Sequence, residues 1–446
     1  MFDTLAKILN VKELRNKLAI TFLLLVVFRL GSFIPTPGVN VQAITEYVNN
    51  AQGAMGAVLS MADMFTGGAL SSMAIFGLGI MPYITASIIF QLLTAIVPSL
   101  SRIAHEGVTG RKKINQYVRV STVALCLIQA GMLAWGLSGS GSDGGYAFVA
   151  DGVSRWEFFI YVLVSLTVGT MFLMWLGEQI DEFGIGNGIS LLIMAGILSR
   201  IPKAIAKLAA GVDPTNPGSD ITIGKIVVIL AFFVAMTLAV VMITLGTRRV
   251  PIMQAKAIRG RKTYGGQRQF LPLKVNQANV IPIIFAQAIM QVVAGFAGMI
   301  LGNFAVFFSP GSFMYTVFYV LLILFFCYFY TAIQFNPNEM ADNLKQGGMF
   351  IPGIRPGKRT AEHLEKIMNR VALAGGVFLS LIAVVPQFVS QSMGVDYDIS
   401  GLLGGTGLLI VVGVALDVVQ RVESYLLMRN YEGFGIAGGR VRGRRN

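Results

Sequence analysis

The stretch that decides the fold is residues 223–246, IGKIVVILAFFVAMTLAVVMITLG, whose only charged residue, Lys225, stands near its start. The hydrocarbon core of a bilayer is about 30 Å thick, and a helix of roughly 20 mostly apolar residues is needed to cross it. Residues 223–246 have that length and that composition. They therefore predict a transmembrane helix.

Nine further apolar runs flank this one. They predict spans at residues 18–34, 73–98, 117–137, 156–177, 188–205, 276–302, 315–334, 370–388 and 403–426. Of the 446 residues, 54% are hydrophobic and 13% are charged, whereas a soluble domain carries about 25% charged residues. We therefore expect an all-α, polytopic membrane protein with ten transmembrane helices. The run at 188–205 is short, so nine spans are the alternative.

The distribution of basic residues predicts the orientation of the chain. With the N-terminus inside the cell, the inner segments hold 28 Lys and Arg residues and the outer segments hold 5. Basic residues gather on the cytoplasmic side of membrane proteins, so both termini are predicted to be cytoplasmic. Two segments depart from this rule. Residues 199–225 are basic although outside, and residues 178–187 are acidic although inside.

A stretch containing Gly, Pro and Asp at residues 206–222 divides the ten spans into five and five. Because five is odd, the second half enters the membrane with the opposite topology, as in an inverted repeat around a central path. We predict two pseudo-symmetric inverted halves, with the boundaries 1–205 for the N-terminal half, 206–222 for an external hinge loop, 223–426 for the C-terminal half and 427–446 for a basic cytoplasmic tail.

Residues 54–72 fit neither a span nor an ordinary exposed loop. They form a short run of small, fairly apolar residues that ends in Gly67-Gly68. The run is too short to cross a bilayer, and irregular backbone at membrane depth is tolerated only where protein or a water-filled cavity surrounds it. A short re-entrant helix inside a cavity is favoured, and a surface amphipathic helix is the alternative.

Motifs for catalysis are missing. The sequence contains no G-x-S-x-G, no H-E-x-x-H and no paired Cys motif. The glycines of 353–359 are separated by one residue fewer than in a P-loop, and Arg359 stands where Ser or Thr would bind Mg²⁺. His105 and His363 stand alone in charged segments. We expect no enzymatic activity, no metal site and no cofactor.

The charge pattern of the spans also bears on transport. Coupled transporters usually place ionisable side chains near the middle of the membrane. The second to ninth predicted spans contain no Asp, Glu, Lys or Arg away from their ends, and Asp417 of the tenth lies near Arg421. A ten-span secondary transporter of a small solute is nevertheless the main alternative to a conduit. An insertase or assembly scaffold without a pore is a third possibility.

Isoleucines recur near the ends of several spans. Ile80 and Ile84 stand four residues apart, as do Ile189 and Ile193. An apolar constriction can close a pore by excluding water, and it offers no fixed charge that would trap a varied cargo. This spacing is more typical of ordinary helix packing, however, so it does not by itself identify a pore.

Seven blocks of sequence resemble signatures of the SecY/Sec61-alpha family, the channel-forming subunits of the Sec protein translocase. In chain order they are 79–89 (GIMPYITASII), 174–180 (MWLGEQI), 184–190 (GIGNGIS), 272–276 (PLKVN), 335–337 (FNP), 341–345 (ADNLK) and 351–357 (IPGIRPG). The resemblance covers almost the whole chain.

The resemblance implies three sets of site residues. A pore ring would consist of Ile80, Ile84, Ile189, Ile193, Ile284 and Ile410. A plug would occupy 54–72 and include Ser60, Met61, Asp63, Met64, Phe65, Gly67 and Gly68. Cytoplasmic partners would bind Arg261 and Lys262 in the loop after the sixth span, and Arg355, Lys358 and Arg359 after the eighth. Spans 2 and 7, opposed by 3 and 8, would form a lateral gate.

The resemblance further implies a passive gated channel for unfolded or nascent polypeptides in the bacterial plasma (inner) membrane. The implied partners are the SecE and SecG subunits, the SecA ATPase, the ribosome and its rRNA, unfolded preprotein or signal peptide, membrane lipid, SecDF and a YidC-type insertase. Arg and Lys suit rRNA phosphate or an acidic protein surface. Positive-inside topology alone also explains basic cytoplasmic loops.

Overall fold

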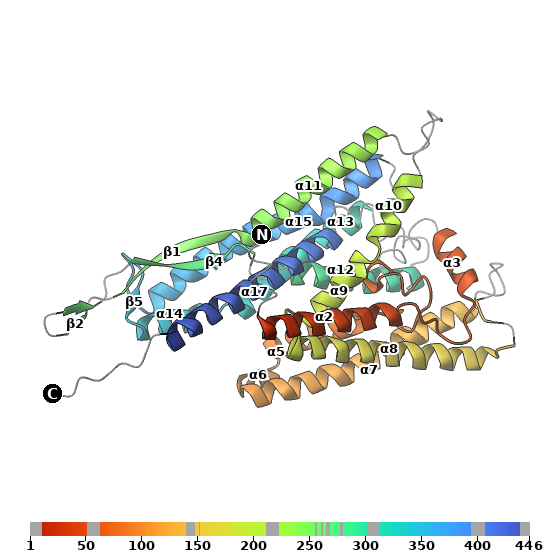
Figure 1. The fold of residues 1–446 in the computed structure, drawn as a ribbon, viewed down its shortest axis with the longest axis horizontal. Helices are drawn as coiled ribbons and strands as arrows, with labels where there is room; N and C mark the ends of the chain where they lie inside the picture. The colour runs from red at the N-terminus through yellow and green to blue at the C-terminus, as the bar shows by residue number, and fades with distance from the viewer. Residues whose placement is uncertain are drawn as a thin grey trace.

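The fold is seen in a computed structural model. It describes residues 11–50, 63–139, 148–150, 152–210, 223–254, 257–259, 262–264, 268–276, 280–300, 312–393 and 406–437. Figure 1 shows an elongated, mainly helical molecule whose helices run roughly along its long axis.

Each of the ten predicted spans coincides with a helix. The helices are α2 (Lys12–Gly31), α5 (Met81–Ile96), α7 (Val108–Gly139), α8 (Arg155–Phe183), α9 (Gly188–Leu198) followed by α10 (Ile201–Ala210), α11 (Ile223–Leu245), α12 (Ile281–Ile300), α13 (Phe313–Gln334), α15 (Lys358–Met393) and α17 (Thr406–Ala437). Within the described ranges, six helical segments are long and apolar enough to cross a membrane, or seven if the bent pair α5 and α6 (Pro98–His105) is one span. The predicted all-α membrane fold class is confirmed.

The predicted boundaries of the second span are wrong at its start. The prediction began at residue 73, but residues 67–80 form successive turns and α5 begins at Met81. Gly67, Gly68 and Gly79 have φ values of 69°, 90° and 60°, a left-handed region that glycine enters without steric cost. The chain therefore changes direction in these turns before the helix starts.

The other end of α5 is bent because of proline. Pro98 follows Val97, whose φ and ψ of −94° and 114° are extended. A residue that precedes proline is disfavoured in the helical region, so the helix stops there and restarts as α6. The two helices meet at an angle of 101°.

The described part of the predicted re-entrant segment is mostly not helical. Residues 63–66 form one helical turn, and turns follow from Gly67 onward. Ser60 and Met61 lie outside the described residues.

A small sheet emerges from the basic loop after α11, where hydropathy alone predicted no structure. β1 (Thr247–Gln254) pairs antiparallel with β4 (Arg268–Lys274) and with β5 (Met349–Phe350), and β2 (Ala257–Arg259) pairs with β3 (Lys262–Tyr264). Val250 and Ile252 are buried on one face of β1, whereas Arg249 and Pro251 beside them are exposed, the alternation of a half-buried strand. The β2–β3 hairpin projects beyond the helices at the left of Figure 1.

The long helices form two groups that meet in one core. Figure 1 shows α2, α5, α7 and α8 together on one side and α11, α13, α15 and α17 together on the other. The largest cluster of buried hydrophobic residues draws on α5, α8 and α9 from the first part of the chain and on α12, α13, α15 and α17 from the second. The structure describes none of residues 211–222, so the domain boundaries stay a prediction.

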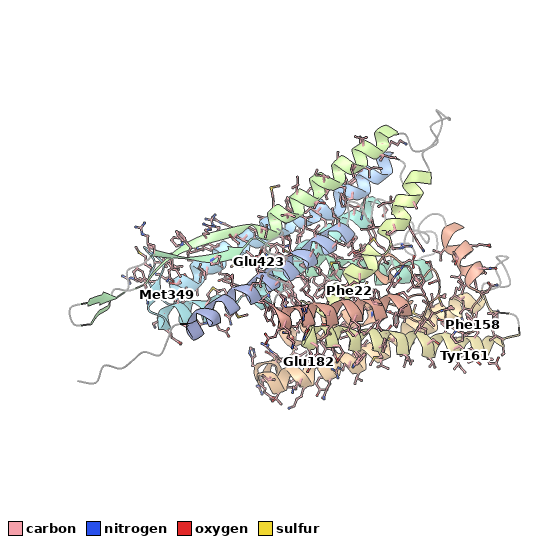
Figure 2. All side chains as sticks on the ribbon, in the orientation of Figure 1. Phe22, Phe158, Tyr161, Glu182, Met349 and Glu423 are labelled. Carbon is pink, nitrogen blue, oxygen red and sulfur yellow. The ribbon has the colours of Figure 1, made fainter. Side chains whose placement is uncertain are left out.

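The outer surface of the bundle is apolar. On α11, the side chains of Val227, Leu230, Leu238 and Met242 are more than half exposed, and Phe22 on α2 is 71% exposed (Figure 2). An apolar surface of this extent fits lipid rather than water. The lipid-facing side chains of α11 and α2 therefore agree with a protein that spans the membrane.

Glu182 and Glu423 lie toward the same end of the molecule as the sheet (Figure 2). Figure 2 shows Phe158 and Tyr161 at one end of α8 and Glu182 at the other. Glu423 on α17 and Met349 at the sheet lie toward the same side as Glu182. The sheet, Glu182 and Glu423 thus lie toward one end of the molecule, and Phe158 and Tyr161 lie toward the other.

Candidate functional site

The isoleucines of the predicted pore ring come together in the core. Five of them are at most 8% exposed and belong to the cluster shared by both groups of helices, and Ile189 is partly buried and packs against it. They come from the turn before α5 and from α5, α9, α12 and α17, in the order Ile80, Ile84, Ile189, Ile193, Ile284 and Ile410. The structure thus brings all six into one apolar region. That they act as a pore ring stays a prediction.

The start of α5 is fixed by a glycine and a proline. Gly79 has a positive φ, and a Cβ built on it would lie 3.0 Å from Cγ2 of Thr66. Pro82 follows in the first turn of the helix, where the absent N–H would have had no helical partner. The tight turn and the early proline place Ile80 just before α5 and Ile84 in its first turn.

The start of α9 is held by two side chains. Oδ1 of Asn187 accepts a hydrogen bond from the Ser190 N–H at 3.0 Å, and Oδ1 of Asp181 accepts one from the Gly188 N–H at 2.7 Å. These acceptors satisfy amides that lack partners at a helix N-terminus. A Cβ on Gly188 would lie 2.0 Å from the carbonyl oxygen of Gly177, so only glycine permits this approach of α9 to α8. The turn thereby orients Ile189 and Ile193.

The described part of the predicted plug rests on the same apolar region. Met64 and Phe65 are 4% and 7% exposed and belong to the cluster that contains the isoleucines. Gly67 lies against Gly196 of α9, because a Cβ built on Gly67 would be 2.9 Å from the Gly196 Cα. The segment is therefore packed closely onto α9 and onto the isoleucine region.

Polar contacts also hold this segment, and the sequence analysis did not anticipate them. Asp63 forms an ion pair with Arg200 and accepts a hydrogen bond from the Ser71 N–H at 2.8 Å. The carbonyl oxygen of Gly67 accepts hydrogen bonds from Arg29 Nη1 at 3.0 Å and from Ser199 Oγ at 3.2 Å. The sequence signal for these contacts is Asp63 itself, because a charged residue within an apolar run usually has a partner of opposite charge.

Of the predicted partner-binding residues after α13, Arg355 lies in the turn after β5, and Lys358 and Arg359 are the first two residues of α15. Arg355, Lys358 and Arg359 are exposed, while Ile351 at the start of the turn is buried against the sheet. Oγ1 of Thr360 donates a hydrogen bond to the Arg355 carbonyl at 2.9 Å. This anchoring leaves the three basic side chains on the surface.

The two predicted partner-binding loops are joined by the sheet. Met253 of β1 pairs with Phe350 of β5, immediately before the 351–357 turn. Lys262 is the first residue of β3, where it pairs with Arg259, and Arg261 lies outside the described residues. The structure therefore connects the C-terminal end of β1 to the turn that carries Arg355.

Helix contacts follow the arrangement that the predicted gate requires. α5 contacts both α7 and α12, and α12 contacts α13.

No group of three or more His, Cys, Asp or Glu within the described ranges is placed to bind a metal ion.

These features define a multi-pass α-helical membrane protein with an apolar seam between two groups of helices and a short segment packed into that seam. A model of the SecY family matches residues 74–419, and the chain belongs to the SecY family. The protein translocase subunit SecY of Thermotoga maritima is 41% identical over the whole of both chains. The same subunit of Escherichia coli K12 is 42% identical, over 94% of this chain and 93% of that protein.

Solved structures share the fold. A protein-conducting channel matches with a TM-score of 0.63 at 18% identity, over 92% of each chain. Sec61 in the canine ribosome–channel complex from the endoplasmic reticulum matches with a TM-score of 0.58 at 16% identity, over 92% of each chain. The chain is therefore a protein-conducting channel subunit. The alternative of a small-solute transporter is not favoured.

Proposed function

We propose that this chain is a passive gated pore for unfolded or nascent polypeptides, closed by the six isoleucines and by the segment that carries Met64 and Phe65. The observation that carries the proposal is their meeting in one buried apolar cluster where both groups of helices join. A constriction lined by aliphatic side chains excludes water and ions when it is closed. It also yields to a polypeptide of any sequence, because it presents no fixed charge.

The packing of α5 against α12 supports a lateral opening. These two helices belong to the first and second halves of the chain, and each carries an isoleucine of the proposed ring, Ile84 and Ile284. If the halves 1–205 and 223–426 move apart around the 206–222 loop, the opening lies between these helices. An apolar segment of the cargo would then pass from the pore into lipid, which solvates it better than water does.

We further propose that the protein lies in the bacterial plasma membrane with both termini in the cytoplasm. The excess of Lys and Arg in the inner segments supports this orientation. The exposed residues Arg355, Lys358 and Arg359, joined to the β1–β4 hairpin through β5, then face the cytoplasm.

That cytoplasmic surface suits a docking role. The sequence holds no nucleotide-binding motif, so the chain itself catalyses no reaction and a partner supplies the energy. Exposed Arg and Lys can bind the acidic surface of a motor such as SecA or the phosphates of rRNA. The related Sec61 channel was solved in a complex with the ribosome. SecE and SecG are proposed as membrane partners, and SecDF and a YidC-type insertase as further ones.

The proposal is tested by reconstituting the chain with SecE and SecA into proteoliposomes and measuring protection of an added preprotein from protease. ATP-dependent protection is expected only when the chain is present. A complex that assembles and binds SecA but protects no preprotein would refute the proposal. Saturable uptake of a small solute without any partner would support the transporter instead.

A further inference from the structure

We propose that Asp63 and Arg200 form a latch that holds the plug segment in its docked position. Here the plug segment means residues 63–71. The inference rests on the proposed function, because it concerns what keeps that segment in the seam. Asp63 stands in the segment itself, and Arg200 stands in the turn between α9 and α10, in the part of the chain that departs from the charge rule.

The pair is buried. The side chain of Asp63 is 1% exposed and that of Arg200 is 15% exposed. A carboxylate taken out of water is stable only when a positive charge and hydrogen-bond donors compensate it. Arg200 supplies the charge, and the Ser71 N–H supplies a second donor at 2.8 Å. The ion pair therefore has the surroundings that a latch needs.

The carboxylate of Asp63 also forms a hydrogen bond within the plug segment. Ser71 follows Asp63 by eight residues, so the bond from its N–H to Oδ1 of Asp63 draws the two ends of the segment together. Oγ1 of Thr66 donates to the Asp63 carbonyl at 3.1 Å and accepts from the Leu70 N–H at 3.2 Å. Asp63 thus organises the turn and also ties it to α9.

Neighbouring contacts make the docking specific. Arg29 and Ser199 both donate to the Gly67 carbonyl, and Gly67 lies against Gly196. Gly196 of α9 therefore contributes the close glycine contact, and Ser199 and Arg200, which follow the helix, contribute one hydrogen bond and the ion pair. The basic character of Arg200, which topology did not explain, follows from this role.

Opening of the pore would release the latch through hydration. In a dry seam the two charges attract strongly, whereas in water the same attraction is weak. A polypeptide that enters and admits water would weaken the pair at the moment when the segment must leave. A closed channel would keep the pair dry and the segment docked.

The latch is tested with Asp63→Asn, Arg200→Gln and the double variant, each in the complete membrane complex without motor or cargo. The first readout is hydrogen exchange of the backbone amides in 63–71, which reports docking directly. The second is ion leakage through the closed channel. Lys203→Gln is the matched control, because Lys203 is exposed one turn further along α10 and has the same charge.

Each single variant is expected to raise exchange in 63–71 at least tenfold, and exchange in α8 stays unchanged if the fold is intact. Removing one partner of a buried pair leaves an uncompensated charge, whereas removing both does not. The double variant is therefore expected to exchange no faster than the worse single variant. Additive effects in the double variant, wild-type exchange in either single variant, or an equal effect of Lys203→Gln would overturn the latch.

The two readouts separate the latch from the proposed function. Faster exchange together with a larger leak supports both. Faster exchange without any leak supports the latch and contradicts the sealing role of the segment. Unchanged exchange overturns the latch, whatever the leak shows.

Discussion

Shortening two isoleucines of the proposed ring should make the closed channel leak. Ile84 and Ile284 are 7% and 8% exposed and come from α5 and α12. Replacing a buried isoleucine with alanine removes about 2–5 kcal/mol of packing free energy. If these side chains form the proposed ring, they separate when the pore opens, so this loss falls mainly on the closed state.

The expected size follows from these figures. About 1.4 kcal/mol is a factor of ten in an equilibrium, so a loss of about 2 kcal/mol from the closed state raises the open population about 30-fold for each single variant, and the double variant is expected to leak more than either. The assay is the ionic conductance of planar bilayers that contain the complex with Ile84→Ala and Ile284→Ala, without motor or cargo. Ile89→Ala is the matched control on α5, because Ile89 is 41% exposed. Unchanged conductance in the double variant, or an equal leak with Ile89→Ala, would refute the reasoning and favour a scaffold without a pore.

Three further predictions concern the docked segment, the cytoplasmic turn and an ion pair. Gly196→Ala should loosen the plug segment, because the new Cβ would lie 2.9 Å from the Phe65 carbonyl oxygen and overpacking costs about 1–3 kcal/mol. The maleimide labelling of a cysteine introduced by Met64→Cys should therefore rise, and unchanged labelling would contradict the contact. Arg355→Glu should reduce ATP-driven import of a preprotein. The membrane complex should still assemble, since Arg355 is exposed, and loss of assembly would show that the turn is structural. Arg119→Ala should leave the thermal unfolding midpoint nearly unchanged. The side chains of Arg119 and Glu178 are 48% and 31% exposed, and ion pairs at the surface contribute about 0–1 kcal/mol. A large fall in the midpoint would show that the pair is structural.

The helices were predictable because hydropathy reports on lipid contact. Every apolar run that predicted a span coincides with a helix, and α11, with its many exposed apolar side chains, gave the clearest signal. The start of α5 was not predictable in this way. Residues 73–80 are as apolar as the helix that follows, and hydropathy does not reveal the positive φ values at Met73 and Gly79 that accompany their turns.

The site was predictable in part. Spacing could not distinguish Ile84 from an ordinary packing residue, and it was the resemblance of the surrounding motif that singled it out. The ion pair between Asp63 and Arg200 joins residues 137 positions apart, so no local pattern contains it. The β1–β5 pairing is likewise long-range, and its local trace was only the alternation of Val250 and Ile252.

The central claim is that a polypeptide passes through the apolar cluster between the two groups of helices. A photocrosslinking amino acid placed at Ile84, Ile193 or Ile410 tests it most directly, with a preprotein arrested during transport and Leu238, 59% exposed on α11, as the lipid-facing control. Crosslinks to the arrested chain are expected from each of the three buried positions and not from Leu238. Crosslinks from Leu238 alone, or from none of the buried positions while transport proceeds, would contradict the account.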